Sequence, residues 1–249
     1  MSLLRGCDVS VFQSPGLVDW RAQDFGIARA TYGTKADKTA LEHVKRIRAA
    51  GKTVGLYHFF RADQAVTAQV DAFAAVATAA GLTAGDLLPC IDVEDYPGHT
   101  IGPLDVPSLT LLDEQIRNHF GGSIIYTTQR DWHRLGKPAW YLERPLWVAH
   151  YPKAGSTLPL ANAATPAGVP WRIHQCIVGP IVAGGWKQDP TNPIAVDQNL
   201  ALSPLPLIAA EEPKQVLDPV VESQIPWVGL TDDDWSEMTE ARDRRVREL

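Results

Sequence analysis

Residues 87–96 read LLPCIDVEDY, an apolar run of the kind that fills a buried strand, and the run ends in three acidic residues. Asp92 and Glu94 are separated by one residue, and Asp95 follows directly. Burying one ionised carboxylate is costly, and burying two side by side costs more. A strand that keeps such a pair at its end therefore indicates a functional site.

Seven further short apolar runs read as strands. Two amphipathic patterns, at 39–50 and 65–80, lie between early runs and read as helices, because Gly51 and Gly81 provide stops. Strands alternating with helices predict an α/β fold in which a parallel sheet closes into a (β/α)8 barrel. The seven runs are LLRGCDVSVF (3–12), IARATYGT (27–34), TVGLYHFF (53–60), SIIYTT (123–128), PLWVAHY (145–151), RIHQCIV (172–178) and IAVDQNL (194–200).

Polar side chains gather toward the C-terminal ends of these predicted strands. In barrels of this type the C-terminal ends of the strands carry the active site. We therefore expect one shared cleft that is lined by Asp8, Tyr32, His58, Asp92, Glu94, Tyr126, His150, Gln175 and Asp197.

The chain divides into a body and a charged tail. The body is predicted to span residues 1–208, followed by a proline-containing linker at 209–230 and a short helix at 231–249. Thr231 would cap this helix, three aspartates occupy its first turn and arginines its end, which suits the helix dipole. The helix is expected either to dock on the body, to remain solvated or to mediate self-association.

Charge and composition exclude several classes of protein. The tail holds eleven of the 29 acidic residues and five of the 23 basic ones, so residues 1–208 carry eighteen of each. A nucleic-acid partner is not expected, because the body lacks a basic excess. Neither a membrane-spanning run nor a signal peptide is apparent. Three cysteines, which form no metal-binding or disulfide pattern, are expected to be buried thiols: Cys7, Cys90 and Cys176.

The spacing of Asp92 and Glu94 points to one kind of chemistry. On a strand both side chains face the same way, about 6.5–7 Å apart along the backbone. That range overlaps the carboxyl separations of retaining (about 5–5.5 Å) and inverting (about 6.5–9.5 Å) glycosidases. Crowding keeps one acid protonated beside an ionised one, as cleavage of a glycosidic bond requires. An ion pair, a solvated strand end, or a Mg²⁺ or Ca²⁺ site that includes Asp8 and Asp197 are the alternatives.

The chain resembles glycoside hydrolase family 25, the Chalaropsis-type lysozymes, over residues 5–202. The resemblance implies a modified (β/α)8 barrel that cleaves the bond between N-acetylmuramic acid and N-acetylglucosamine in peptidoglycan. The motifs that carry it, in the order of that family, are GCDVSVFQ with VDW, ARATYGTKADK, AAGKTVGLYHFF, LLPCIDVE, IIYTT, LWVAHY, HQC and AVDQN.

Residue roles follow from this resemblance. Glu94 matches the general acid, and Asp92 matches the residue that attacks the anomeric carbon or orients the 2-acetamido group of the substrate to do so. Asp8 and Asp197 match flanking acids that tune Glu94 and bind sugar. No cofactor is implied. Groove positions that contact sugar rings are matched by Tyr57, Tyr126, Trp147 and Gln175, although Tyr57 and Trp147 could equally serve barrel packing.

Two positions depart from the pattern of the family. Thr31-Tyr32-Gly33 stands where T-E-G is common, and His174-Gln175 stands where W-Q is common. Tyr32 remains a candidate for substrate binding, but the lost acid makes a non-catalytic glycan-binding module the main alternative, ahead of a chitinase-like barrel glycosidase. The expected setting is a phage-type lysin that stays in the cytoplasm of the producing cell until membrane pores release it to the cell wall.

Overall fold

The computed structural model of the chain describes residues 3–151, 165–179, 181–182, 185–186 and 195–210. The predicted helix at 231–249 and nearly all of the linker lie outside these residues, so their role stays a prediction. The strands are β1 (Leu3–Val9), β2 (Phe25–Tyr32), β3 (Lys35–Ala36), β4 (Thr53–Phe59), β5 (Cys90–Asp92), β6 (Ile124–Thr127), β7 (Leu146–Ala149), β8 (Ile173–Gly179), β9 (Ile181–Val182), β10 (Gly185–Trp186) and β11 (Val196–Leu202). The α-helices are α1 (Ala40–Ala49), α2 (Val66–Ala79), α3 (Val106–Phe120) and α4 (Gln129–Arg134), and the 3-10 turns are η1 (Trp20–Ala22), η2 (Pro103–Asp105), η3 (Ala139–Glu143) and η4 (Pro166–Gly168).

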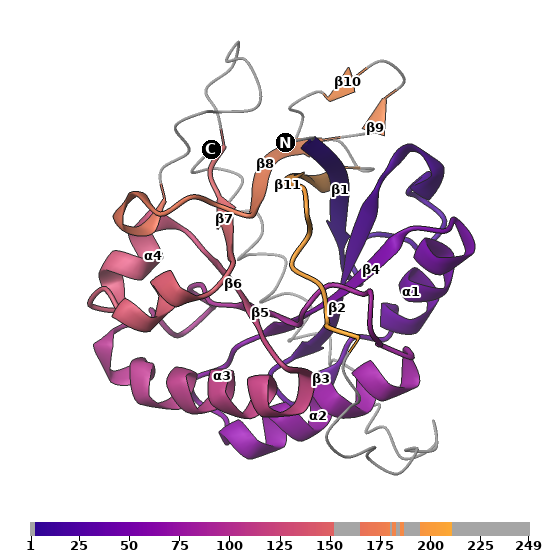
Figure 1. Cartoon of the computed structure of the whole chain (residues 1–249). Helices are drawn as coiled ribbons and strands as arrows, with labels where there is room; N and C mark the ends of the chain where they lie inside the picture. Colours follow the sequence, from indigo (N-terminus) through magenta and orange to yellow (C-terminus); the bar gives the residue numbers. More distant parts are fainter. Residues whose placement is uncertain (1–2, 152–164, 180, 183–184, 187–194, 211–249) are drawn as a thin grey trace.

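The main sheet closes into a barrel, as predicted. Its strand order is β1-β11-β8-β7-β6-β5-β4-β2-β3, and a further pairing of β1 with β2 joins the two sides. Eight strands form the ring, and β3 extends only the end of β2. The helices α1 to α4 lie around the outside of the strands (Figure 1). The fold class is therefore confirmed as an α/β barrel.

The last strand of the barrel differs from the expected all-parallel sheet. β11 runs antiparallel to both of its neighbours, β1 and β8. A parallel return needs a long crossover, usually a helix, whereas the described part of the β8–β11 connection contains the antiparallel pair β9–β10. As a result Asp197 lies near the start of its strand, not at its C-terminal end, and still reaches the end of the barrel where the parallel strands finish.

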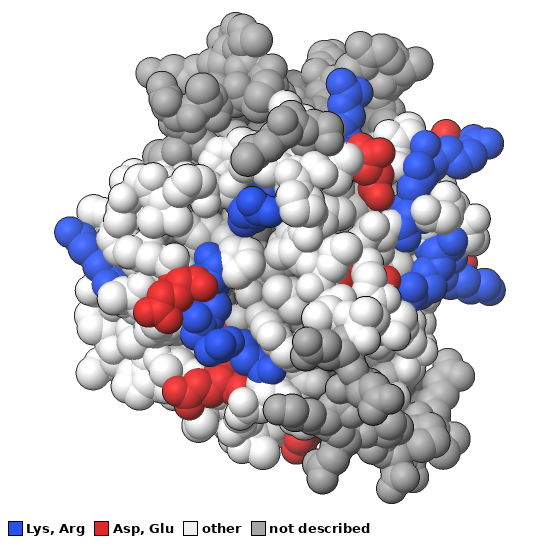
Figure 2. Space-filling view, in the orientation of Figure 1, with Lys and Arg blue, Asp and Glu red and all other residues white. Residues whose placement is uncertain are grey.

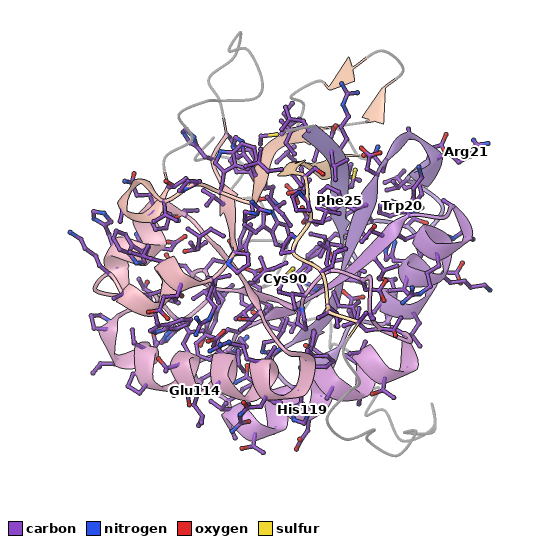
Figure 3. All side chains as sticks on the ribbon, in the orientation of Figure 1. Trp20, Arg21, Phe25, Cys90, Glu114 and His119 are labelled. Carbon is purple, nitrogen blue, oxygen red and sulfur yellow. The ribbon has the colours of Figure 1, made fainter. Side chains whose placement is uncertain are left out.

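Two groups of buried side chains hold the barrel together. Alternate residues of each strand face outward and pack against the helices, as do Ile91, Ile125 and Val148. The intervening residues fill the interior, where Figure 3 shows Phe25 and Cys90 within the ring of strands and Glu114 on the outer helix α3. The interior group comprises Phe25, Ile27, Tyr57, Leu87, Cys90, Ile124, Tyr126, Trp147, Ala149, Ile173 and Ala201.

The two predicted helices form where the sequence places them. α1 and α2 lie within the predicted ranges 39–50 and 65–80. Gly51 and Gly81 follow them with φ angles of 70° and 64°, a left-handed conformation that glycine adopts without strain. Their role as stops is confirmed.

Charged side chains of both signs are interspersed on the face of the molecule that Figure 2 shows. No helix in the described part of the chain is both long and apolar enough to cross a membrane.

His58 does not join the polar residues predicted at the shared cleft. It lies on β4 between Tyr57 and Phe59, which face the interior, so its imidazole faces α2 instead. There it is fully buried, and its ring meets that of Phe73 edge to face at 6.1 Å between centroids. The residue is part of the packing between sheet and helix.

The hydrogen bonds of His58 identify its neutral tautomer. The amide nitrogen of Gln69 donates to the carbonyl oxygens of Arg61 (2.8 Å) and Gln64 (3.0 Å), so Gln69 Oε1 is left to accept. His58 Nε2 therefore donates to Gln69 Oε1 at 3.1 Å, and Nδ1 accepts from Thr31 Oγ1 at 2.6 Å. Burial lowers the pKa of His58 to about 4.

This shift makes folding sensitive to mild acid. Between pH 6.5 and about 4 the unfolded chain binds a proton at His58 that the folded protein does not, so stability falls as the pH decreases through this window. We expect protonation of His58 alone to lower the free energy of unfolding by about 3 kcal/mol between neutral pH and pH 4. Urea unfolding from pH 7 to 4 should show a flatter pH dependence for His58→Gln than for the wild type. Parallel curves for the two proteins would contradict the assignment.

Candidate active site

The four acids predicted to be catalytic reach the same end of the barrel. Asp8 is the penultimate residue of β1, and Asp92 is the last residue of β5. Both are buried, with 7% of each side chain exposed. Asp8 is directly opposite Asp197 in the antiparallel pairing of β1 with β11. Glu94 lies two residues beyond the end of β5 and is half-buried.

The chain around Asp92 stays extended beyond the end of the strand. The carbonyl oxygen of Asp92 accepts from the backbone of Phe60 at 3.0 Å, and the backbone N–H of Val93 donates to Tyr126 at 3.3 Å. Val93 packs on the outer side of the sheet, among the residues that face the helices. Alternation along this extended segment therefore directs Asp92 and Glu94 toward the opposite side, at the mouth of the barrel.

Buried neighbours respond to the charges of these acids. Burial raises the pKa of the Cys90 thiol, and the charges of Asp8 and Asp92 raise it further. The pKa of the Cys7 thiol is raised in the same way by burial, then by Asp8 and Asp197. Asp8 thus acts on both thiols, one together with Asp92 on β5 and the other together with Asp197 on β11. Asp8, Asp92 and Asp197 therefore act on the same buried region of the barrel.

Two amide side chains hold the carboxylate of Asp8. Its Oδ2 accepts a hydrogen bond from Gln175 Nε2 at 2.8 Å and another from Asn199 Nδ2 at 2.7 Å. Hydrogen bonds to a charged carboxylate stabilise its ionised form. Gln175 and Asn199 are themselves at most 1% exposed, so this support is rigid and dry.

A second set of hydrogen bonds fixes the orientation of both amides. Gln175 Oε1 accepts from the hydroxyls of Tyr126 (2.9 Å) and Tyr151 (2.6 Å). Asn199 Oδ1 accepts from Trp147 Nε1 at 2.8 Å. With both amide oxygens engaged, both amide nitrogens point to Asp8. The predicted residues Tyr126, Trp147 and Gln175 are therefore brought together with Asp8.

Asn199 and Tyr151 are members of this network that the sequence interpretation did not single out. Asn199 is two residues after Asp197 and therefore faces the same side of β11, a spacing that would have identified it. Tyr151 ends the apolar run 145–151, where the other runs also carry polar residues.

The aromatic residues predicted to bind sugar are packed together. The Trp147 ring meets Tyr126 edge to face at 4.7 Å and Tyr57 at 6.1 Å between centroids. Tyr57 is 9% exposed, and Tyr126 and Trp147 are 2% exposed. Tyr57 and Trp147 thus do pack in the barrel interior, the alternative role considered for them, and their contacts with sugar stay a prediction.

Tyr32 takes part in a cluster at the end of β2, β4 and β5. Its ring packs against Phe59 at 4.7 Å, and its hydroxyl accepts from Arg61 Nη1 at 2.9 Å. Arg61 also lies 4.2 Å above the ring of Tyr96 and forms an ion pair with Asp63 at 2.8 Å. Where the resemblance leads us to expect an acid, this chain therefore has a buried phenol that anchors an arginine.

The remaining predicted residues have simpler surroundings. His150 directly follows β7, is half-buried, and donates from its backbone N–H to the carbonyl of Gln175 at 3.1 Å. Cys7, Cys90 and Cys176 are buried free thiols, as expected. In the parts of the chain that the structure describes, no group of three or more His, Cys, Asp or Glu residues is arranged to hold a metal ion.

Changing Asn199 to aspartate tests the support of Asp8. The substitution keeps the shape of the side chain but places a carboxylate oxygen where an N–H now donates at 2.7 Å, so one of the two acids must take up a proton. We expect the activity of the site at neutral pH to fall by about 10–100-fold. Asn118→Asp, at an exposed position of α3, is the matched control. Equal rates for the two variants would show that Asp8 does not depend on Asn199.

Comparisons with known proteins agree with this geometry. The sequence profile of Glycosyl hydrolases family 25 matches residues 7–176. No curated protein matches the chain. A family 25 glycosyl hydrolase from Bacillus anthracis has a similar structure, with 23% identity over 80% of this chain and 88% of that one and a TM-score of 0.59.

Two further solved structures have the same fold. The bacterial lysozyme from Streptomyces coelicolor is 24% identical over 80% of this chain and 92% of that one, with a TM-score of 0.61. The catalytic domain of endolysin ply40 from bacteriophage P40 of Listeria monocytogenes is 18% identical over 81% of this chain and 94% of that one, with a TM-score of 0.59. Because the profile match runs from β1 to β8 and includes Asp8, Asp92 and Glu94, the chain belongs to glycosyl hydrolases family 25 and is a glycoside hydrolase.

Proposed function

We propose that the protein is a lysozyme of the N-acetylmuramidase type, which hydrolyses the β-1,4 bond between N-acetylmuramic acid and N-acetylglucosamine in peptidoglycan. The observation that carries this proposal is the placement of Asp8, Asp92, Glu94 and Asp197 at one end of a family 25 barrel. The lysozyme from Streptomyces coelicolor and a muramidase from Trichobolus zukalii, both similar in fold, support the choice of substrate.

Glu94 is the general acid in this proposal. It lies beyond the strand and is half-buried, so its carboxyl group can reach a sugar oxygen while it remains close to the buried Asp92. The negative charge of Asp92 favours the protonated form of its neighbour. Glu94 then donates its proton to the glycosidic oxygen as the bond to the leaving sugar breaks.

Asp92 carries the complementary role. Its ionised carboxylate either attacks the anomeric carbon or orients the 2-acetamido group of the substrate for that attack, and in both routes it stabilises positive charge on the sugar. Its position at the end of β5 is fixed by backbone hydrogen bonds on both sides. The backbone that carries this side chain is thus held in place before substrate arrives.

Asp8 and Asp197 complete the negative environment of the cleavage site. Hydrogen bonds from Gln175 and Asn199 favour the ionised form of Asp8, and Asp197 is opposite it on β11. Negative charge here stabilises the oxocarbenium-like transition state and binds sugar hydroxyls. Tyr57, Tyr126, Trp147 and Gln175 remain the predicted groove residues around these acids.

Analysis of the new reducing ends tests the proposed bond. Purified peptidoglycan is incubated with the protein, reduced with borohydride and analysed by mass spectrometry. Muramitol ends that are absent from a Glu94→Gln digest would support the proposal. Glucosaminitol ends would assign the protein to a different bond. A protein that sediments with the wall and creates no new ends would be a glycan-binding module, and the proposal would fail.

A further inference from the structure

We propose that Arg29 is a positioning residue that keeps Asp92 ionised by placing a buried positive charge beside it. The inference rests on the proposed function, in which Asp92 must carry a negative charge. Neither composition nor spacing singles this arginine out, because it lies inside an apolar strand.

Arg29 is inside the barrel. It follows Phe25 and Ile27 at alternate positions of β2, and both of these residues belong to the interior group. Only 4% of the arginine is exposed. Its neighbour in the parallel pairing with β4 is Tyr57, and the neighbour of Tyr57 on β5 is Cys90.

The side chain of Arg29 extends from this level toward that of Asp92. The guanidinium carbon is 6.0 Å from the centre of the Tyr32 ring. Tyr32 pairs with Phe59, and Phe59 pairs with Asp92. The guanidinium therefore reaches the part of the interior in which the carboxylate of Asp92 is held.

One edge of the guanidinium is anchored by Asp37. Arg29 Nε donates to Asp37 Oδ2 at 2.9 Å, and the two side chains are 4% and 0% exposed. Asp37 is in turn fixed by donors from the backbone of Val11 (3.0 Å) and by both the backbone (2.9 Å) and hydroxyl (2.7 Å) of Thr39. The anchor leaves the charge of Arg29 available elsewhere.

In the described part of the chain, one nitrogen on the anchored edge of the guanidinium has no hydrogen-bond partner of its own. Arg29 Nη2 is buried and makes no hydrogen bond to any residue that the structure describes. A buried donor without a partner is costly, and a guanidinium is always charged. The ion pair with Asp37 therefore does not fully satisfy this buried cation.

The charge of Arg29 acts on Asp92. Burial disfavours the charged guanidinium, yet attraction to the carboxylates of Asp37 and Asp92 and the hydrogen bond to Asp37 act in the opposite direction, and the pKa of Arg29 is raised. Electrostatic coupling is reciprocal, so Arg29 must favour the ionised form of Asp92.

Other titratable groups around Asp92 do not replace Arg29. Burial raises the pKa of the Cys90 thiol and of the Tyr57 phenol, so both remain neutral. Arg61 lies two residues beyond the end of β4, where it is paired with Asp63 and bound to Tyr32. The other titratable groups at this end of the barrel are Asp8 on β1, Tyr32 on β2, Tyr126 on β6, Asp197 on β11 and Glu94 beyond β5.

Without a compensating cation, the carboxylates of Asp8 and Asp197 would oppose ionisation of Asp92. A protonated Asp92 could neither attack nor stabilise a cationic sugar, and it would no longer favour the protonated form of Glu94. Arg29 thus determines the lowest pH at which the site is competent.

The two halves of the ion pair provide the test. The rate of peptidoglycan cleavage is measured from pH 3 to 8 for wild type, Arg29→Met, Asp37→Asn, and the double variant. In Arg29→Met the acidic limb of the profile should move to higher pH by roughly 0.5–1 pH unit. Asp37→Asn breaks the same ion pair but leaves the cation. The acidic limb of its profile should therefore stay at the wild-type pH or move to lower pH. The double variant should lie between Arg29→Met and the wild type.

A purely structural ion pair makes a different prediction, because both single variants would then change the profile in the same direction. That result would overturn the inference. If Arg29→Met does not fold, the double variant still tests the proposal, since removal of both partners leaves no unpaired buried charge. Arg29→Lys, which keeps the charge, should retain the position of the wild-type limb.

Direct titration separates this inference from the proposed function. The carboxyl carbon of Asp92 is followed by NMR in Glu94→Gln and in Glu94→Gln with Arg29→Met, neither of which needs activity. A midpoint that rises on loss of Arg29 supports the inference even if the wild type cleaves a different bond. An unchanged midpoint, together with an active wild type, refutes the role of Arg29 and leaves the proposed function intact.

Discussion

Replacing Glu94 by glutamine is expected to lower kcat for peptidoglycan hydrolysis by about 10³-fold, because the variant cannot supply a proton to the leaving oxygen. Glutamine has nearly the same shape, and Glu94 lies outside the strand, so the fold should be unaffected. Since the substrate is bound by other groups, KM should change little. The rate is measured as new reducing ends per enzyme under saturating substrate.

A comparison of leaving groups shows whether the loss concerns proton donation. A glycoside with an acidic phenol as leaving group needs little protonation, so Glu94→Gln should retain far more of its rate on this substrate than on peptidoglycan. Glu114→Gln, on the exposed face of α3, is the control for the substitution itself (Figure 3). Equal losses on both substrates would assign Glu94 a role other than general acid.

The strand pattern was sufficient to predict the barrel, because burial on both faces makes its strands read as apolar runs and glycines mark the ends of α1 and α2. The direction of β11 was not predictable in this way. An apolar run has the same pattern in either direction, and only the pairing with β1 and β8 reveals that it is antiparallel. The wrong expectation still placed Asp197 correctly, since the start of an antiparallel strand meets the ends of parallel ones.

The acids were also predictable, whereas their support was predicted only in part, through Tyr126, Trp147 and Gln175. Asp92 and Glu94 stand out because charge at the end of an apolar strand is rare. Asn199 and Tyr151 are ordinary polar residues, and only their hydrogen bonds to Gln175, Trp147 and Asp8 give them a role. Such contacts join strands that are far apart in the chain.

His58 shows the limit of a pattern based on residue type. Its position near a strand end matched the other polar residues, but a shift of one position on a strand turns a side chain to the opposite face. Tyr57 and Phe59 occupy the interior positions of β4, so His58 had to face α2. Alternation within the run TVGLYHFF would have excluded it from the cleft.

Replacing Asp92 by asparagine is expected to lower kcat by about 10²–10³-fold, because an amide cannot carry the negative charge that stabilises the cationic sugar. The backbone contacts of Asp92 to Phe60 do not involve the side chain, so the strand should remain in place. Thermal unfolding checks this point. An Asp92→Asn enzyme with the rate of the wild type would exclude the residue from the chemistry.

De-N-acetylated peptidoglycan then distinguishes the two roles of Asp92. If the carboxylate attacks the anomeric carbon itself, the wild type should still cleave next to a muramic acid that lacks its acetyl group. If the 2-acetamido group of the substrate is the nucleophile, this glycan has no group for Asp92 to orient, and cleavage should fail even in the wild type. In the second case Asp92→Asn and the wild type should be similarly inactive on the modified glycan, whereas in the first the difference between them should persist.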